Sequence, residues 1–512
     1  MIVVYHQNHK VVRVLDVATQ ENINFDVFSI SKTILIIAER FPDAIILWCE
    51  MSCISNLNLE VIPEIFHHKK LLLSYSPDNY FSSEIGYVDE SPFINVNKKV
   101  SYPTWQMSGL VGGIPSSVLN ALKNQVICEA NFDYFLCSLA KLGMPLGLLC
   151  YSEPKLLQNH EINIKTNFGN RVKLFQFVKQ HYRMRWIFLL FLNLVIYEKQ
   201  FPIVAFLNSF FYKKKKWEAT VLDSIEVHSN KKIIGDKTID VIIPTIGRKK
   251  YLYDVLKDLA QQTHLPINVI IVEQNPQPNS QSELDYIENE VWPFKIKHTF
   301  TNQPGACNAR NIALSQVESE WVFLADDDIR FDCDFIYEAI NKIETMGTKS
   351  AIFNCFLKGE KNKYLTISQT TIFGSGCSII NKMISNKVLF NNSLEFGYGE
   401  DTDFGLQLRN RGEDIIYFPK PSILHIKAPM GGFRIKPILD WDKAKTAPKP
   451  SPTIMYVKQK YNTLEQINNY KTGLFIKSLK NTAWNNKIQF LQSFQKKWNV
   501  SIYWSNQLKL NK

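Results

Sequence analysis

The chain has 512 residues, of which 45% are hydrophobic and 12% aromatic, and its formal net charge is +11. This length is too great for one ordinary domain, so two or three domains are expected, and the composition favours large globular cores over a disordered chain. The nine cysteines are an odd number with no zinc-ligand or redox spacing, which predicts buried free thiols in a reducing compartment.

The positive charge is concentrated in two segments. Residues 171–217 carry ten Lys or Arg against one acid, a net +9, and residues 440–512 carry thirteen Lys against three acids, a net +10, which leaves −8 elsewhere. Aromatic residues are interleaved in both segments, namely Trp186 with many Phe, then Tyr456, Tyr461, Tyr470, Trp484, Trp498 and Trp504. This mixture predicts docking on an anionic membrane surface, with a solvated Lys-rich tail as the alternative. No nucleic-acid-binding motif is present, so nucleic acid is not expected as a partner.

Residues 1–164 are expected to form an α/β domain, because apolar runs at 44–48 and 71–73 alternate with helical patterns. The N-terminus has no basic segment typical of a signal peptide. Residues 165–235 are predicted to be a basic, aromatic, helical connector. Its longest apolar stretch, from Trp186 to Tyr197, is shorter than the roughly 18 residues that span a bilayer.

Residues 236–439 show the most regular pattern. Continuously apolar strands are predicted at 239–243, 269–272 and 321–325, and they alternate with helices at 251–262 and 309–317. This alternation predicts a parallel sheet covered on both faces, which binds its ligands beyond the carboxyl ends of the strands. Residues 440–512 are expected to form a basic helical tail.

Three consecutive aspartates, Asp326, Asp327 and Asp328, follow the strand at 321–325. Several carboxylates at one strand end repel each other unless a cation lies between them, and their oxygens suit Mg²⁺ or Mn²⁺. The alternative interpretation is an acidic loop that caps a helix.

Other polar segments follow the strands in a fixed order: Pro244–Arg248, Glu273–Asn275, Asn302–Asn311, the aspartate triplet, Phe373–Gly376, Gly397–Phe404 and His425. This ordered set resembles glycosyltransferase family 2. The resemblance covers roughly residues 238–435. It implies the A-type glycosyltransferase fold, a Rossmann-like, mostly parallel sheet flanked by helices, and an enzyme of the hexosyltransferase type that uses nucleotide sugars.

The resemblance also implies roles for individual residues. Those that would bind the nucleotide sugar are Pro244, Thr245, Arg248, Glu273, Asn302, Gly305, Arg310, Asp326 and Asp327. The family more often has Asp where Glu273 stands, and Glu273 could instead be a surface acid at a strand end. Arg310 could face the diphosphate or pair with an acid of the triplet. Gly374, Ser375 and Gly376 would form a floor under the acceptor.

Asp326 and Asp328 match the outer carboxylates of the family's Asp-x-Asp motif and would hold Mn²⁺ or Mg²⁺. His425 would add a metal or diphosphate contact, although a lone histidine is more often structural. Asp401 would be the general base that accepts the proton of the acceptor hydroxyl, with Glu400 as the second candidate. The alternative for both acids is the negatively charged first turn of a helix over 403–410.

The N-terminal domain carries a weaker echo of the same pattern. Ser108–Ile114 resembles Phe373–Cys377, and Asp133–Leu136 resembles Asp403–Leu406, but no acidic triplet or Glu-Asp pair stands at the matching places. We therefore expect either a degenerate, non-catalytic glycosyltransferase-like domain or a plain α/β accessory domain.

Taken together, the sequence predicts a metal-dependent inverting glycosyltransferase. Its expected partners are a nucleotide-diphosphate sugar donor, a glycan or lipid-linked acceptor of bacterial surface polysaccharide synthesis, and an anionic membrane. Its expected location is cytoplasmic, on the inner face of the cell membrane. The competing hypotheses are a sugar-nucleotide nucleotidyltransferase, whose Gly-rich, basic loop is absent after residue 243, and a non-catalytic glycan-binding scaffold.

Overall fold

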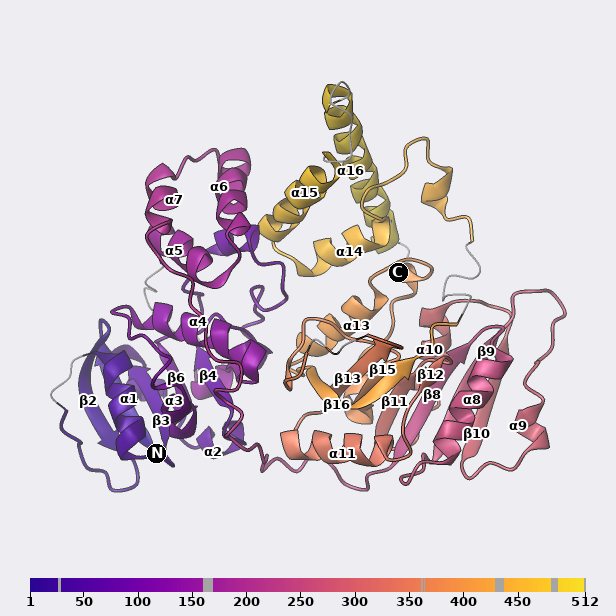
Figure 1. Ribbon diagram of the computed structural model, residues 1–512, viewed down its shortest axis with the longest axis horizontal. Helices are drawn as coiled ribbons and strands as arrows, with labels where there is room; N and C mark the ends of the chain where they lie inside the picture. The colour runs from indigo at the N-terminus through magenta and orange to yellow at the C-terminus, as the bar shows by residue number, and fades with distance from the viewer. Residues whose placement is uncertain are drawn as a thin grey trace. The chain divides into compact units, whose positions relative to one another are not determined.

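The computed structural model describes residues 1–25, 29–159, 169–360, 362, 364–428, 437–479 and 487–510 (Figure 1). The chain divides into two compact units. Unit 1 consists of residues 1–231 and 462–477, and unit 2 consists of residues 232–461 and 478–512. The expected domain boundary near residue 164 and the tail residue Trp484 lie outside the described residues.

Unit 1 contains a seven-stranded sheet. In order across the sheet, its strands are β2 (Lys10–Asp16), β1 (Ile2–Gln7), β3 (Ile45–Glu50), β6 (Val111–Pro115), β4 (Leu71–Tyr75), β7 (Leu149–Ser152) and β5 (Tyr102–Pro103). The pairs β1–β3 and β4–β7 are parallel, and the other neighbours are antiparallel.

The helices of unit 1 fall into two groups (Figure 1). The sheet is accompanied by α1 (Ile30–Arg40), α2 (Ile62–Ile65), α3 (Ser116–Leu122) and α4 (Phe132–Gly143). Beyond α4 lie α5 (Arg171–His181), α6 (Arg185–Glu198) and α7 (Ile203–Ser209), all within the predicted basic connector. From the C-terminal segment, α15 (Leu464–Leu479) joins this group, where Asn469 Oδ1 accepts a hydrogen bond from Asn193.

Unit 2 contains a nine-stranded sheet. Its strands are β10 (Lys295–Thr301), β9 (Asn268–Gln274), β8 (Ile239–Thr245), β11 (Trp321–Ala325), β15 (Cys377–Asn381), β13 (Ser350–Leu357), β16 (Ile416–His425) and β12 (Ile329–Arg330), with β14 (Ser368–Gln369) beside β16. The first four strands are parallel and β15 is antiparallel to β11. This mostly parallel order confirms the predicted A-type glycosyltransferase fold.

Helices cover the sheet of unit 2, and further helices follow its last strand in the C-terminal segment. They are α8 (Lys249–Ala260), α9 (Tyr286–Asn289), α10 (Ala306–Leu314), α11 (Phe335–Met346), α12 (Lys382–Ser385), α13 (Glu400–Arg409), α14 (Pro452–Tyr461) and α16 (Lys487–Leu510). The predicted strand at 321–325 is observed with the same bounds. The predicted helix at 309–317 begins three residues earlier, because Gly305 rather than Asn308 precedes its first turn.

Five strands have the same arrangement in both units. The order β1-β3-β6-β4-β7 in unit 1 corresponds to β8-β11-β15-β13-β16 in unit 2, with the same strand directions and the same order along the chain. The two sheets differ at one edge. Beside β8 the parallel strands β9 and β10 extend the sheet of unit 2, whereas the antiparallel strand β2 pairs with β1 in unit 1.

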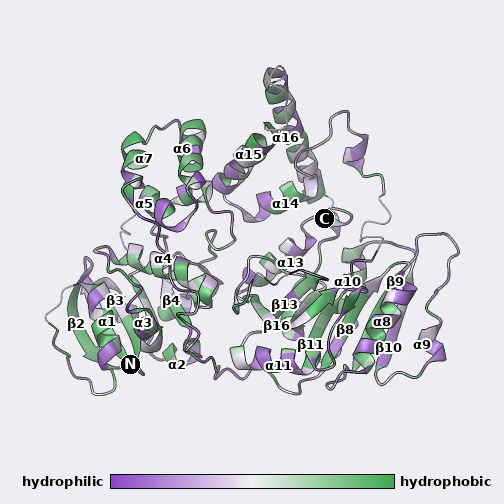
Figure 2. Cartoon of the chain, viewed as in Figure 1, coloured by the Kyte–Doolittle hydropathy of each residue, from purple (hydrophilic) through white to green (hydrophobic). Residues whose placement is uncertain are grey.

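The strands form the cores of both units, and Figure 2 shows their hydrophobic colouring. All nine cysteines are free thiols, and five of them are buried as expected. Cys333 and Cys355 are exposed, which corrects the expectation of nine buried thiols, because Cys333 lies in the segment after β12 and Cys355 lies in the second half of β13, where the strand is no longer buried. Among the described residues, no helix is both long and apolar enough to cross a bilayer.

Candidate functional site

A cavity of about 380 Å³ opens at the carboxyl ends of β8 and β11 in unit 2. Ten of the predicted site residues line it, namely Pro244, Thr245, Arg248, Gly305, Arg310, Asp326, Asp327, Asp328, Glu400 and His425. Such a volume lies within the range of small-molecule binding sites. The segments that the sequence places after separate strands therefore meet at one place.

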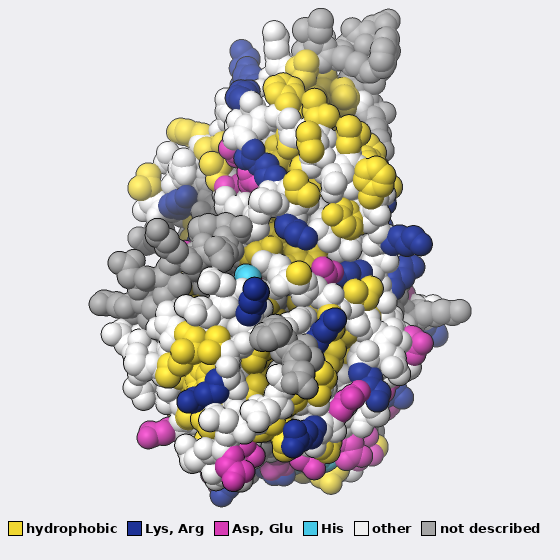
Figure 3. Space-filling model, turned by 90° about the vertical axis from the view of Figure 1, so that its left-hand side faces the viewer, with side chains coloured by type: hydrophobic (Ala, Val, Ile, Leu, Met, Phe, Trp, Pro, Cys, Tyr) yellow, Lys and Arg dark blue, Asp and Glu magenta, His cyan; other side chains and the backbone are white. Residues whose placement is uncertain are grey.

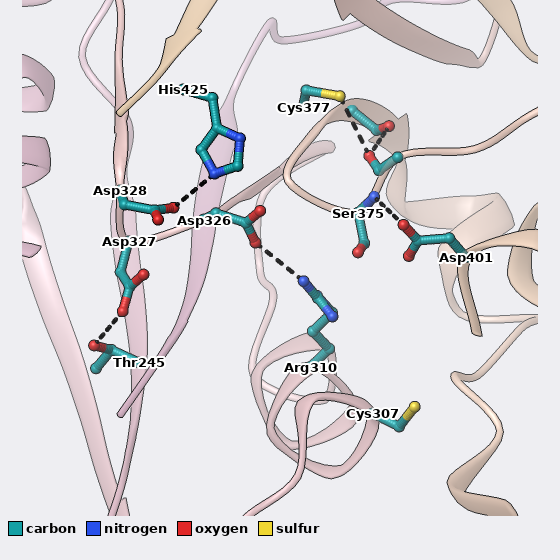
Figure 4. A network of polar contacts seen from close by, with 12 residues as sticks. Thr245, Cys307, Arg310, Asp326, Asp327, Asp328, Ser375, Cys377, Asp401 and His425 are labelled. Carbon is teal, nitrogen blue, oxygen red and sulfur yellow. Dashed lines mark hydrogen bonds and ion pairs between the residues drawn. The ribbon is translucent and has the colours of Figure 1, made fainter. Parts of the chain in front are cut away.

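Asp327 and Asp328 are held by a single arginine. The Arg248 guanidinium lies 2.5 Å from Asp327 Oδ1 and 2.8 Å from Asp328 Oδ2. Thr245 Oγ1 also donates a hydrogen bond to Asp327 Oδ2 over 2.7 Å. Burial raises the pKa of Asp327 to about 6, against the opposing charge of Arg248. Asp327 thus points back to the β8 loop rather than into open space (Figure 4).

Asp326 points the other way, towards α10 (Figure 4). Its Oδ1 lies 3.0 Å from Arg310 Nη2, and its side chain is 37% exposed, whereas those of Asp327 and Asp328 are 6% and 4% exposed. A Cβ atom at Gly376 would stand 2.1 Å from Asp326 Oδ2, so only glycine leaves room for this carboxylate. Asp326 is the acid of the triplet that a ligand in the cavity reaches most easily.

His425 ends β16 and contacts the triplet. Its Nε2 lies 3.3 Å from Asp328 Oδ1, and this contact raises the pKa of His425. Burial would raise the pKa of Asp328, but hydrogen bonds from His425 and the Ala428 amide, with the charge of Arg248, lower it overall. Asp328 therefore stays ionised at neutral pH.

The carboxylate oxygens of this cluster are suitable ligands for a hard divalent cation. Among the described residues, no three His, Cys, Asp or Glu side chains are grouped so that they could hold an ion by themselves. Mg²⁺ is commonly bound by only one or two carboxylates together with substrate phosphates. Asp326 and Asp328 supply two such carboxylates at the cavity wall, so the residues fit an ion that binds together with a diphosphate.

Asp401 lies beside this cavity, on the first turn of α13. Its Oδ2 accepts a hydrogen bond from the Ser375 amide over 3.4 Å. Its Oδ1 is buried and has no hydrogen-bond partner among the described atoms. Burial raises the pKa of Asp401, although the nearby charge of Arg310 opposes the shift. Burial likewise raises the pKa of Glu400, which lines the cavity itself.

Residues 240–399 match the family model described as glycosyl transferase family 2. Unit 2 contains a glycosyltransferase family 2 domain. The matched residues include every predicted site residue except Glu400, Asp401 and His425, which follow the end of the match.

Curated relatives match part of the chain. Glycosyltransferase GlyG of Streptococcus pneumoniae serotype 4 is 28% identical over 21% of this chain and 33% of its own length. Poly(ribitol-phosphate) beta-N-acetylglucosaminyltransferase TarS of Staphylococcus aureus is 30% identical over 17% of this chain and 16% of its own. The chain thus spans a third or less of these relatives. The crystal structure of S. aureus TarS 1–349 in complex with UDP-GlcNAc has 17% identity and a TM-score of 0.35, covering 50% of this chain and 79% of that one.

Two predicted donor-site residues of the family 2 domain do not line the cavity. Glu273 is buried, where its Oε2 lies 2.9 Å from His298 Nε2 and its Oε1 accepts the Glu283 amide. Asn302 is exposed, and its amide donates to the Asn275 and Gln277 carbonyls and to Ser280. Both side chains therefore organise the loops that follow β9. The predicted acceptor-floor residues Gly374, Ser375 and Gly376 lie between Asp326 and Asp401, outside the cavity lining.

Some residues of the domain line the cavity but were not predicted from the sequence. Glu395 accepts the amides of Cys307 and Asn308 over 3.0 and 2.9 Å, at the N-terminus of α10. Gln274 Oε1 accepts the Gly305 amide over 2.6 Å. Gly305 has φ +148°, and a Cβ atom there would stand 2.5 Å from Glu395. Gly305 was expected at the site from its match to the family segment, but nothing in the sequence links Glu395 to this helix.

The C-terminal segment supports the helix that carries Asp401. Asp403 is fully buried, and its Oδ1 lies 2.6 Å from Lys460 Nζ and 2.9 Å from the Tyr461 hydroxyl. Thr453 packs on Gly397, where a Cβ atom would stand 2.4 Å away, and its hydroxyl accepts the Tyr398 amide. Helix α14 and its first residues thus hold both the loop before α13, at Gly397 and Tyr398, and the first turn of α13, at Asp403.

Unit 1 has an aspartate at the place of Asp401. Asp133 is the second residue of α4, as Asp401 is of α13. Asp133 accepts a hydrogen bond from the Gly109 amide, two residues before β6, and Asp401 accepts one from the Ser375 amide, two residues before β15. The sequence pattern instead paired Asp133 with Asp403. That alignment is wrong by two residues, because similarity of residue types outweighed position in the helix. The first residue of α4 is Phe132, where α13 has Glu400.

Proposed function

We propose that unit 2 transfers a sugar from a nucleotide-diphosphate donor to a hydroxyl of an acceptor. The observation that carries this proposal is the pairing of two features of unit 2. A cavity lined by the aspartate triplet and two arginines can hold an anionic donor, and Asp401 beside it keeps a buried, unpartnered carboxylate oxygen. A buried polar atom without a partner calls for an explanation, and a catalytic role is one such explanation.

The donor would bind in the cavity of unit 2. Arg248 and Arg310 would face the diphosphate, where Arg recognises phosphate oxygens through parallel N–H donors. Pro244 and Thr245 would line the nucleotide pocket, while Glu273 and Asn302 would act through the loops they hold. The TarS structure is a complex with UDP-GlcNAc, which makes uridine diphosphate sugars the first donors to test.

A divalent ion, Mn²⁺ or Mg²⁺, would bind with the diphosphate at Asp326 and Asp328, with His425 next to Asp328. When bound, it would neutralise the charge that develops on the leaving diphosphate. Asp328 is suited to this task because its pKa is lowered, so that it keeps its charge at neutral pH.

Asp401 would accept the proton of the acceptor hydroxyl. The acceptor oxygen then forms a bond to the anomeric carbon, while the bond from that carbon to the diphosphate breaks and the nucleoside diphosphate leaves. Such a single displacement inverts the anomeric configuration. A raised pKa makes Asp401 a stronger base than an ordinary aspartate, and the Ser375 amide fixes the direction of its carboxylate.

The acceptor and the location are part of the same proposal. We propose a glycan or lipid-linked acceptor of bacterial surface polysaccharide synthesis, reached from the inner face of the cell membrane. The support is the relatives' names, which describe bacterial glycosyltransferases, and the basic segments of the chain, which favour an anionic surface.

The test is a screen of nucleotide sugars for hydrolysis and for thermal stabilisation, each with and without Mn²⁺. We expect at least one nucleotide sugar to stabilise the protein and to be hydrolysed, and both effects to fall in Asp326→Asn. A protein that binds glycans but no nucleotide sugar would contradict the proposal and would favour a glycan-binding scaffold.

A further inference from the structure

Helices α6 and α7 of unit 1 have apolar side chains on opposite faces. One face of α6 packs inward, where Ile187, Leu190 and Leu194 are fully buried. A helix that is apolar all round is normally enclosed by protein. Here the second face of α6 is open to solvent, and α7 shares this property. Figure 2 shows the hydrophobic colouring of both helices.

The exposed side chains form a continuous set. On α6 they are four residues apart, which places them in one stripe along the helix: Met184, Phe188, Leu192 and Ile196. On and around α7 they are Phe201, Ile203, Val204, Leu207, Phe210 and Phe211. We name these ten residues the apolar hairpin surface. Val204 and Phe211 are the most exposed, at 78% and 86%.

Aromatic contacts join the two helices into one surface. The Phe206 ring lies 5.5 Å from Phe188, 4.9 Å from Phe191 and 5.2 Å from Phe210. Such edge-on and tilted pairs stabilise beyond the area they bury. The apolar hairpin surface is therefore presented by a fixed pair of helices, and large exposed apolar patches of this kind mark interaction sites.

Cations surround the apolar hairpin surface. Arg183, Arg185 and Lys199 are exposed at the ends of α6, and Lys213, Lys214 and Lys216 are exposed after α7. Figure 3 shows hydrophobic side chains towards the top of this side of the protein, with Lys and Arg at the edges.

The lysine run also lines a hollow. A cavity of about 270 Å³ is bordered by Lys213–Lys216, Gln180 and Trp217. Lys215 pairs with Glu129 over 2.7 Å, which anchors the run to the unit, while its three neighbours are directed to solvent. The first lysine of the hollow, Lys213, follows Phe211 by two residues in the sequence. The hollow therefore offers cations next to apolar side chains, which suits an anionic lipid headgroup.

We propose that the apolar hairpin surface inserts into one leaflet of an anionic phospholipid bilayer, with the lysines of residues 213–216 on the lipid phosphates. Helix α6 has 14 residues, about 21 Å, so it is too short to cross a core of about 30 Å and lies along the interface instead. A second copy docked through the same surface would bring two sets of cations together, which disfavours a symmetric dimer.

This inference deepens the membrane association proposed above and is independent of the transfer chemistry. It assigns the contact to the hairpin rather than to residues 440–512. In that segment Tyr456 and Trp498 are buried, and Tyr461 and Trp504 are half-buried, so these aromatics stabilise unit 2 rather than face a membrane.

The test is co-sedimentation of the full-length protein with vesicles of phosphatidylcholine alone or mixed with phosphatidylglycerol, at low and high salt. Wild type should bind the anionic vesicles, less so at high salt. Val204→Asp should lower the partition coefficient by roughly tenfold. Its matched control is Val291→Asp, a fully exposed valine in unit 2, which should bind as wild type does.

A second pair of variants tests the charges. Lys213→Glu with Lys214→Glu and Lys216→Glu should lose most binding to anionic vesicles and most of its salt dependence. Lys342→Glu with Lys358→Glu and Lys387→Glu, at exposed lysines of unit 2, should keep both. Circular dichroism confirms that each variant is folded.

The outcomes separate the two proposals. If wild type fails to bind anionic vesicles, membrane association itself is wrong, whether or not sugar transfer is observed. If wild type binds and Val204→Asp binds equally well, the association stands but its assignment to the hairpin is wrong. A variant-sensitive dimer without vesicle binding would instead identify the surface as a protein interface and overturn the proposal.

Discussion

Units 1 and 2 use the same arrangement of five strands for different ends. In unit 2 the central strand β11 leads into Asp326, and the parallel strands β9 and β10 widen the sheet. In unit 1 the matching strand β3 ends at Glu50 and is followed by Met51 and Ser52, and β2 lies at the edge. The difference teaches that an aspartate at the helix position of Asp401, here Asp133, occurs beside a sheet whose matching strand carries no acidic triplet and whose edge lacks counterparts of β9 and β10.

The buried aspartates of the two units also show what is shared. Asp89 in unit 1 lies 2.6 Å from Lys141 Nζ and 2.7 Å from the Tyr182 hydroxyl. In unit 2, Asp403 has the same kinds of partners in Lys460 and Tyr461. Both units are therefore stabilised by a buried Asp-Lys-Tyr cluster, and only unit 2 adds the arginine-bound triplet.

The largest effect is expected at the two matching aspartates. Asp401→Asn removes the proposed base, so kcat for sugar transfer should fall by roughly 10³-fold. Asp133→Asn, at the same place in unit 1, should keep kcat within about twofold of wild type. The measurement is initial rates at saturating donor, with thermal unfolding as the folding control. Equal losses in both variants would mean that unit 1 takes part in catalysis.

The second-largest effect is expected at the acids that stand at the ends of β11 and β3. Asp326→Asn should lower kcat/KM by roughly 100-fold and weaken stabilisation by Mn²⁺ with a nucleoside diphosphate. Glu50→Gln, at the end of β3, is the matched change in unit 1 and should alter neither quantity. Thermal shifts with and without Mn²⁺ measure this. Undiminished Mn²⁺ stabilisation in Asp326→Asn would remove that residue from the ion site.

The two buried clusters should respond alike. Lys460→Met and Lys141→Met each leave a buried carboxylate without its cation, at a cost in unfolding free energy of about 2–3 kcal/mol, reduced from the fully buried case because both lysines are partly exposed. Denaturant unfolding measures it. Burial alone would raise the pKa of Asp89, but Lys141 lowers it overall, so this stabilisation is present at neutral pH and is lost as pH falls below the unfolded pKa of about 4. A stable Lys141→Met protein would show that the cluster is not needed.

The smallest effect concerns pH. The base must be ionised, so activity should be lost as pH falls through the raised pKa of Asp401. Arg310 lowers that pKa, so Arg310→Met should move the acid limb of kcat/KM upward by about one pH unit or less. Arg330→Met, which breaks the pair with Asp258 away from the cavity, is the control and should leave the limb in place. A downward shift in Arg310→Met would contradict the role of Asp401.

Much of unit 2 follows from local sequence. Apolar runs such as 321–325 predict buried strands, and polar residues after them meet at one sheet edge because parallel strands end together. The triplet was found in this way, whereas the roles expected of Arg248 and Arg310 came from the resemblance to glycosyltransferase family 2. Helix positions were less exact, since helix ends depend on single capping residues such as Gly305.

What the sequence did not predict depends on contacts between distant segments. Glu395 caps α10 from 88 residues away, and Lys460 reaches Asp403 from the tail. The outward direction of the α6–α7 stripe was also hidden, because an apolar stretch does not reveal which face is covered. Likewise, the match between Asp133 and Asp401 could be recognised only from their positions in the two helices. In the sequence, Tyr134 and Phe135 make the segment after Asp133 resemble the one after Asp403.

The most direct measurement is the number of donor sites per chain. Isothermal titration of the full-length protein with a nucleoside diphosphate and Mn²⁺ should give one site, and that site should be weakened by Asp326→Asn but not by Glu50→Gln. Two equivalent sites per chain, or one site that survives Asp326→Asn, would contradict the claim that unit 2 alone binds the donor.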